Sequence, residues 1–85
     1  MPSKIIDAVE AERMAEKFEQ RHLDSKGRTL MNFRTASTEL KTIDGAREYV
    51  VKYEYRDHPL GDWKKGISRV RATHGGQVVS NKDDL

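Results

Sequence analysis

The sequence predicts an α+β fold in which one N-terminal helix packs on a four-stranded antiparallel sheet. Three patterns predict it: small and apolar residues recur at helical spacing over residues 7–22, an Asp-Gly pair at 44–45 separates two β-prone runs, and apolar and polar residues alternate over 49–56. We expect residues 1–80 to form a single α+β domain and residues 81–85 to be a polar C-terminal tail. Because 85 residues bury only a small core, every element has to contribute to it.

The first predicted element is an amphipathic helix that begins at Asp7. Asp7 and Glu10 have the spacing of a capping box, and Ile6 is placed to pack against Ala11 as a hydrophobic staple. The stripe expected to face the core consists of Ala8, Ala11, Ala15, Phe18 and His22, with Met14 beside it. Three alanines let a helix lie close to a flat surface, which favours a sheet as its neighbour. Turn residues and a glycine at 24–27 end the helix.

A two-residue hairpin is predicted at Asp44-Gly45, between two β-prone runs. Its register sets three pairs on one face of the sheet: Leu40 opposite Tyr49, Thr38 opposite Val51, and Ala36 opposite Tyr53. On the other face it sets Lys41 opposite Glu48, and such an opposite-charge pair favours one register. The small-to-large pairs and the charge pair therefore support the same hairpin.

The second strand of this hairpin alternates as a half-buried antiparallel strand requires. One side carries Tyr49, Val51, Tyr53 and Tyr55, which we expect to meet the helix, and the other carries Val50, Lys52, Glu54 and Arg56. Residues 57–62 contain Pro and Gly and break the sheet. Residues 63–73 then predict a third strand with Gly66 as a bulge, a turn follows at 74–77, and residues 78–80 predict a short fourth strand.

This order of elements resembles the layout of the cystatin and nuclear transport factor types, in which a helix lies on a curved sheet to form an α-β roll. The resemblance concerns the layout alone, and it assigns no functional residue in this chain.

Composition excludes several classes of protein. The chain is 35% hydrophobic and 35% charged, with a mean hydropathy of −0.86 and no cysteine, so disulfide frameworks, thiolate zinc sites and thiol enzymes are excluded. No stretch approaches the roughly 20 apolar residues of a membrane span, and the N-terminus lacks the pattern of a signal peptide. We therefore expect a soluble, cytoplasmic protein without a membrane partner.

Positive charge is concentrated in the second half of the chain. The net charge is only +2, but residues 46–80 hold seven basic side chains and four acidic ones. The segment 64–71 contains four of these cations and no acidic residue. This segment is the predicted third strand, so we expect a positive field over the sheet.

The sheet face that points away from the helix is the predicted binding surface. Its expected apolar anchors are Phe33, Val50 and Ile67, joined by Val78, and the expected basic residues around them are Arg56, Arg69 and Arg71. A small chain gains nothing from an exposed apolar patch unless a partner or a second copy covers it. Alternatively, strand bulges shift one or two of these residues inward.

We therefore expect a small non-enzymatic protein-binding module that meets an acidic partner. It would act as an inhibitor, an adaptor or a regulatory subunit, a role that suits a phage or bacterial accessory protein, and a homodimer is possible.

The alternative is a nucleic-acid-binding protein. Cations on the basic strand would meet phosphates and the single tryptophan would stack on a base; its expected residues are Lys52, Trp63, Lys64, Lys65, Arg69 and Arg71. Lys26-Gly27-Arg28 would support either class of partner. Tyr49, Tyr53 and Tyr55 would add to this surface only if they were exposed, whereas the hairpin register puts them in the core.

No catalytic set is expected. His22, His58 and His74 match no metal-ligand spacing, and the sequence predicts no metal site and no cofactor. Glu54 with Asp57 or Asp62 could in principle supply acid and base groups, but nearby arginines favour simple ion pairs. A third class, a ligand pocket between helix and sheet, is disfavoured because Phe18, Met14 and the tyrosines would fill that space.

Overall fold

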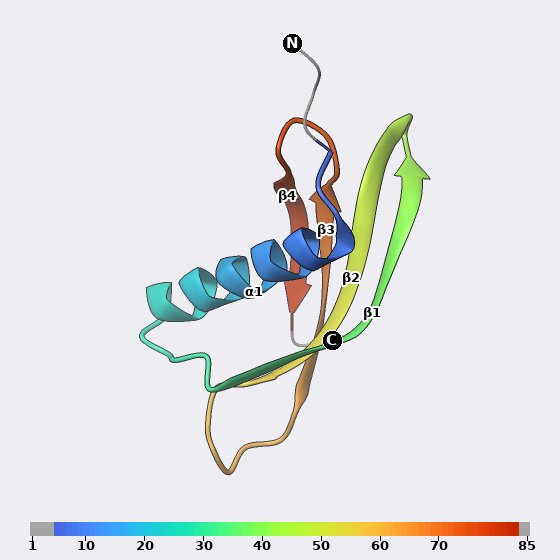
Figure 1. Ribbon diagram of the computed structural model, residues 1–85. Coiled ribbons are helices and arrows are strands. Elements are labelled where there is room, and N and C mark those ends of the chain that lie inside the picture. The colour runs from blue at the N-terminus through green and yellow to red at the C-terminus, as the bar shows by residue number, and fades with distance from the viewer. Residues whose placement is uncertain (1–4, 84–85) are drawn as a thin grey trace.

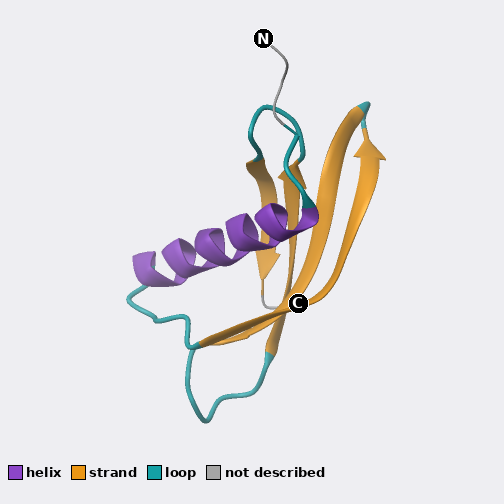
Figure 2. Cartoon of the chain, in the orientation of Figure 1, coloured by secondary structure: helices purple, strands orange, loops and turns teal. Residues whose placement is uncertain are grey.

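The computed structural model describes residues 5–83 and has the predicted α+β architecture. Helix α1 (Ala8–Ser25) precedes four strands, which are β1 (Asn32–Ile43), β2 (Ala46–Arg56), β3 (Lys64–Arg71) and β4 (Gln77–Asp83). The strands form one antiparallel sheet in the order β1-β2-β3-β4. Helix α1 runs across one face of this sheet, and no described element lies on the other face (Figure 1 and Figure 2).

Helix α1 begins as predicted and buries Ala11 and Ala15 of the predicted stripe, but its buried row continues to Glu19 and Leu23. The Asp7 carboxylate accepts a hydrogen bond from the backbone N–H of Glu10 at 2.8 Å, which caps the helix. The buried residues are Ala11, Ala15, Glu19 and Leu23, whereas Phe18 is 41% exposed, so its predicted place in the buried stripe is wrong. The helix lies obliquely across the strands (Figure 1). Residues spaced by four along a helix form a row that is inclined to the helix axis. In this oblique orientation, the row from Ala11 to Leu23 is the one that lies against the sheet.

The predicted hairpin between β1 and β2 is confirmed. Ile43 pairs with Ala46, and the turn residues Asp44 and Gly45 have φ angles of 51° and 79°. Two positive φ angles are the mark of a type I′ turn, whose twist matches that of the strands it joins. The predicted pairs nearest the turn also form: Lys41 with Glu48, Leu40 with Tyr49, and Thr38 with Val51.

A β-bulge at Ala36 changes the register of the rest of β1. Thr35, not Ala36, lies opposite Tyr53, and Phe33 lies opposite Tyr55. An extra residue in one strand moves all the side chains beyond it to the other face of the sheet. Phe33 therefore faces α1 and stacks on Tyr53, with 4.8 Å between ring centroids. Its predicted position on the outer face is wrong, and the inward shift by a bulge is what occurs.

Strand β3 is shorter than predicted and contains no bulge at Gly66. Gly66 pairs in register with Tyr53 on β2 and with Asp83 on β4. A Cβ atom at Gly66 would lie 2.3 Å from Cζ of Tyr53, so the tyrosine ring occupies the space that a side chain would need. This position requires glycine because the ring of Tyr53 packs directly against its backbone. The pairing between β2 and β3 continues through Gly66 without interruption.

The bulge at this side of the sheet lies in β4. Val70 pairs with Val78 and Arg69 pairs with Ser80, so Val79 is the extra residue. Val78 consequently packs against the core and does not join the outer face as predicted. Strand β4 also continues to Asp83, so residues 81–83, which the sequence assigns to a tail, belong to the sheet.

The core lies between α1 and the helix-facing side of β2 and β3. Its buried members are Ile6, Ala11, Ala15, Leu23, Val51, Tyr53, Tyr55 and Val70. The predicted tyrosine face is confirmed, and the hydroxyl of Tyr49 donates to the carbonyl oxygen of Ile6 at 3.1 Å. Among the described residues, no helix is both long and apolar enough to cross a membrane.

Candidate functional site

The side chains of β2 and β3 that point away from α1 form one continuous surface, which we call the outer face. It comprises Glu48, Val50, Lys52, Glu54, Arg56, Lys65, Ile67, Arg69 and Arg71. Five of the six residues predicted to bind a protein partner are here, namely Val50, Arg56, Ile67, Arg69 and Arg71, together with Lys52 and Lys65 of the nucleic-acid alternative. The alternation of side chains along both strands sets this arrangement. Lys64 pairs with Tyr55 and lies on the opposite side of the sheet from Lys65.

Two half-buried apolar residues lie at the centre of the outer face. Val50 is opposite Arg69 and Ile67 is opposite Lys52, so each has a basic residue directly across the strand pair. A hollow of 390 Å³ opens beside Ile67, lined by Ala36, Lys52, Tyr53, Glu54, Lys65, Gly66 and Ile67. The bulged residue Ala36 and the glycine at position 66 both line this hollow. The surface thus offers an apolar depression with a lysine on each side.

One end of the outer face holds a partly neutralised group of arginines. The Glu48 carboxylate is 3% exposed and accepts a hydrogen bond from Nε of Arg69 at 2.7 Å. This hydrogen bond raises the pKa of Arg69, which remains charged. Arg71 lies opposite Glu48 in the register of β2 and β3. The buried Nε of Arg71 has no hydrogen-bond partner among the described residues. Glu48 can neutralise only one of these two cations, so the group stays positive.

Trp63 lies at the other end of the outer face, under two arginines. The guanidinium carbons of Arg34 and Arg56 are 3.9 and 4.7 Å from its ring centroid, which are cation–π distances. Arg34 also donates to Glu54 at 3.0 Å, and Arg56 donates to Oδ1 of Asn32 at 2.7 and 3.2 Å. The ring surface that these guanidinium groups cover is not available to stack on a nucleobase.

Two carboxylates that could supply acid or base groups, Glu54 and Asp57, form ion pairs. Glu54 pairs with Arg34, and Asp57 pairs with Arg28 and, at 3.7 Å, with Lys64. Ion pairs therefore form at Glu54 and Asp57 as predicted, but not with the expected cations Arg56, Arg69 and Arg71. Arg28 is therefore engaged with the loop that follows β2 and does not extend the outer face.

The three histidines lie in three separate places. Nε2 of His22 is 3.5 Å from a carboxylate oxygen of Asp83, Nδ1 of His58 accepts from the backbone N–H of Leu60 at 3.1 Å, and His74 occupies a turn with a φ of 57°. Within residues 5–83, no three His, Cys, Asp or Glu side chains are arranged to hold a metal ion.

A polar cluster between α1 and β4 has no counterpart among the predicted site residues. The Glu19 side chain is fully buried, and its Oε2 accepts a hydrogen bond from Nδ2 of Asn81 at 3.2 Å. Oδ1 of Asn81 in turn accepts from the hydroxyl of Tyr53 at 3.0 Å. Asp83 lies within hydrogen-bonding reach of Glu19. One signal could have revealed this cluster, namely the four-residue spacing that continues from Ala11 and Ala15 to Glu19 and Leu23.

Burial changes the acidity of two members of this cluster. Loss of solvent, together with the hydrogen bond and charge of Asp83, raises the pKa of Glu19 to about 7. Burial and the nearby Glu19 charge raise the pKa of Tyr53 as well, so its hydroxyl stays protonated and remains a donor to Asn81.

Comparison with known proteins identifies no relative of this chain: no family model matches it, and neither a curated protein nor a solved structure does.

Proposed function

We propose that this protein is a non-enzymatic binding module whose outer face docks on an acidic surface of a partner protein. The observation that carries the proposal is the apolar depression at Ile67, with Lys52 and Lys65 beside it. An apolar side chain of the partner would enter this depression while carboxylates around it meet the lysines. Interfaces of this kind place a buried anchor at the centre and charged contacts at the rim.

The charges of the outer face also favour an acidic protein. The outer face carries more positive than negative charges, because the same strands hold Lys52, Lys65, Arg69 and Arg71 but only two glutamates. The face therefore attracts an acidic surface over a distance. Docking on it would make the module an inhibitor, an adaptor or a regulatory subunit of that partner.

A nucleic-acid partner is less well supported by the same residues. Glu48 and Glu54 lie between the cations and pair with Arg69 and Arg34 at 2.7 and 3.0 Å, so the face lacks an uninterrupted row of cations for a phosphate backbone. A base that stacked on Trp63 would also have to compete with Arg34 and Arg56, which already lie over its ring.

The test uses three forms of the protein as bait: the wild type, Ile67→Asp, and Val9→Asp as a matched control. Val9 is 59% exposed on α1, so its variant introduces the same charge on the other side of the sheet. Each bait is immobilised and exposed to lysate from the source cells, with and without nuclease. Circular dichroism verifies that all three are folded. A captured protein is then purified, and its affinity for each form is measured at 50 and 200 mM salt.

We expect a nuclease-resistant acidic protein that binds the wild type and Val9→Asp equally and binds Ile67→Asp at least tenfold more weakly, because a charge replaces the central apolar group. Equal binding by the folded Ile67→Asp variant would exclude the outer face. Capture of nucleic acid that is lost after nuclease treatment would support the alternative function. Self-association of the wild type that Ile67→Asp abolishes would identify a second copy as the occupant.

A further inference from the structure

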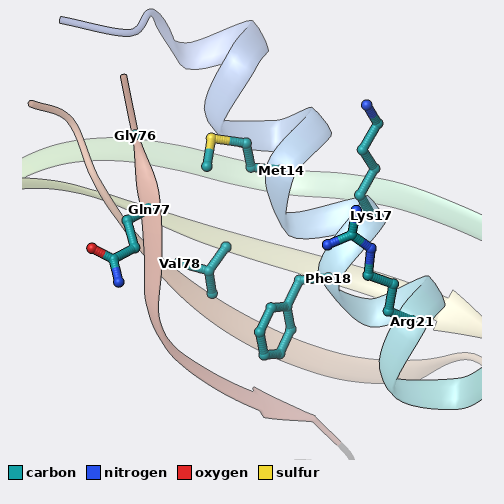
Figure 3. Close-up of a pocket in the computed structure, with 7 residues that line it drawn as sticks. All are labelled: Met14, Lys17, Phe18, Arg21, Gly76, Gln77 and Val78. Carbon is teal, nitrogen blue, oxygen red and sulfur yellow. The ribbon is translucent and has the colours of Figure 1, made fainter. Parts of the chain in front are cut away.

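Helix α1 and strand β4 meet along a seam whose two halves differ in chemistry. In the first half, Met14 and Phe18 of α1 face Val78 of β4, and the side chains of Lys17, Arg21 and Gln77 lie around them (Figure 3). This half is incompletely packed, because a hollow of 390 Å³ lies between the two elements and Phe18 is 41% exposed. The second half is the buried cluster of Glu19, Asn81 and Asp83. The polar half is therefore the buried part of the seam, whereas the first half is open to solvent.

The hydrogen bonds of the cluster leave one oxygen without a donor. Oε2 of Glu19 accepts from Asn81, but the buried Oε1 has no hydrogen-bond partner within the described chain. The hydroxyl of Tyr53 also lies within hydrogen-bonding reach of Glu19, but its single hydrogen is donated to Asn81 at 3.0 Å. The remaining neighbour, Asp83, is a carboxylate, and two ionised carboxylates in contact repel each other. A proton placed between Glu19 and Asp83 supplies the missing donor and removes the repulsion.

Apart from His22, the described groups that face Glu19 carry no positive charge. Strand β2 contributes Tyr53, which stays neutral, and the facing positions of β3 are Gly66 and Ser68, neither of which titrates. Helix α1 contributes His22, which lies 3.5 Å from Asp83. When protonated, His22 pairs with Asp83, and it is the one group in the cluster that can offset negative charge.

From this cluster we infer that Glu19 and Asp83 share a proton that holds α1 against β4, so that the seam loosens as the pH rises through neutrality. The raised pKa of Glu19, about 7, supports this inference and gives the range of pH. The sign follows from linkage. The folded state holds the proton up to a higher pH than the unfolded state, whose glutamate ionises near 4.5, so the contribution is complete below pH 4.5 and lost as the pH rises through 7.

The test compares urea unfolding of the wild type, Glu19→Gln and Asp83→Asn from pH 4.5 to 8.5. Glutamine imitates the protonated glutamate, since its amide donates to Asp83 without a proton from solvent. Asparagine at position 83 instead donates to Glu19 and lets it ionise. Glu16→Gln, an exposed change one turn earlier on the same helix, is the matched control.

We expect the folding equilibrium constant of the wild type to fall on the order of a hundredfold more than that of Glu19→Gln over this range. Glu19→Gln should therefore exceed the wild type in stability at pH 8, and Glu16→Gln should follow the wild type. Identical pH profiles for the wild type and Glu19→Gln would overturn the inference.

A measurement on the wild type keeps the inference testable if either variant fails to fold. The carboxyl carbon of Glu19, followed by NMR, should titrate near neutral pH, and a midpoint near 4.5 would overturn the shared proton. Backbone amide exchange, corrected for its intrinsic pH dependence, should lose protection in α1 and β4 before the β1–β2 hairpin. Equal loss of protection in both regions would show that no seam opens and would overturn the local effect.

Discussion

The ring of Tyr53 lies across Gly66 on the neighbouring strand, at the place where any other residue would carry its Cβ atom. The nearest ring atom, Cζ, is 2.3 Å from that position, well inside any permitted contact. This approach lets the hydroxyl of Tyr53 reach Asn81 on β4, beyond the strand that it crosses. Because β3 has no side chain at Gly66, the side chain of Tyr53 on β2 can pass over β3 and hydrogen-bond to β4.

Gly66→Ala should destabilise the fold strongly, because the rigid ring of Tyr53 must move and lose its hydrogen bond. Overpacking of a filled core costs about 1–3 kcal/mol, and we expect the upper part of that range in urea unfolding. Ser68→Ala, two residues along the same strand, is the control. The buried Ser68 hydroxyl has no hydrogen-bond partner among the described residues, so its removal should cost little. Equal stability of the two variants would mean that the ring is easily displaced.

Gly75 and Gly76 allow backbone strain to be separated from packing. Both have a positive φ, 80° and 90°, but a Cβ at Gly75 meets nothing within 4 Å, whereas one at Gly76 would lie 2.7 Å from Sδ of Met14. Alanine should cost about 1 kcal/mol at position 75 from strain alone, and more at position 76 because Met14 is displaced as well. Thermal unfolding of both variants measures the difference. A larger loss at position 75 would contradict the contact with Met14.

Phe33→Ala should reduce stability more than Ile67→Ala. Phe33 stacks on Tyr53 and packs against the core, so its removal should cost about 2 kcal/mol, whereas the half-buried Ile67 on the outer face should cost about half as much. Chemical denaturation of the two variants distinguishes the helix-facing side of the sheet from the outer face. The reverse order would place Phe33 outside, as the unbulged register predicts.

Trp63 provides a direct optical test of the nucleic-acid alternative, since it is the single tryptophan of the chain. Because guanidinium groups already lie over its ring, saturating oligothymidine at low salt should leave the Trp63 emission unchanged. Arg34→Ala should shift that emission to longer wavelength as water reaches the ring. Lys52→Ala, a change on the outer face that does not touch Arg34 or Arg56, should leave the emission wavelength unchanged. Saturable quenching of the wild type by the oligonucleotide would instead show that the ring stacks on bases.

The elements set by short-range rules could be predicted from the sequence. The cap at Asp7 and the turn at Asp44-Gly45 each depend on residues within a few positions of one another, and both are confirmed. The alternation along β2 placed Val50 and Arg56 on the outer face, and the alternation along β3 placed Ile67, Arg69 and Arg71 there, because alternation needs no knowledge of distant contacts.

The remaining errors come from interactions that join distant parts of the chain. Nothing in the residues around Ala36 or Val79 marks them as bulges, and each bulge reversed the face expected for one apolar residue, Phe33 or Val78. The spacing along the helix could indicate that Glu19 is buried, but not that its partner is Asn81, which is 62 residues away. The depression beside Ile67 is lined by the bulged residue Ala36 as well, so the register predicted without a bulge did not indicate it.

The positions of the two bulges have a consequence for behaviour at high concentration. An open sheet ends in two strands whose free backbone groups can recruit strands from other molecules, and long regular edges of this kind nucleate fibrils. Here the two edge strands, β1 and β4, are the ones that contain the irregularities, at Ala36 and Val79. Each irregularity shortens the regular stretch open to an incoming strand. The same extra residues that reposition Phe33 and Val78 thus oppose the growth of this sheet from one molecule into the next.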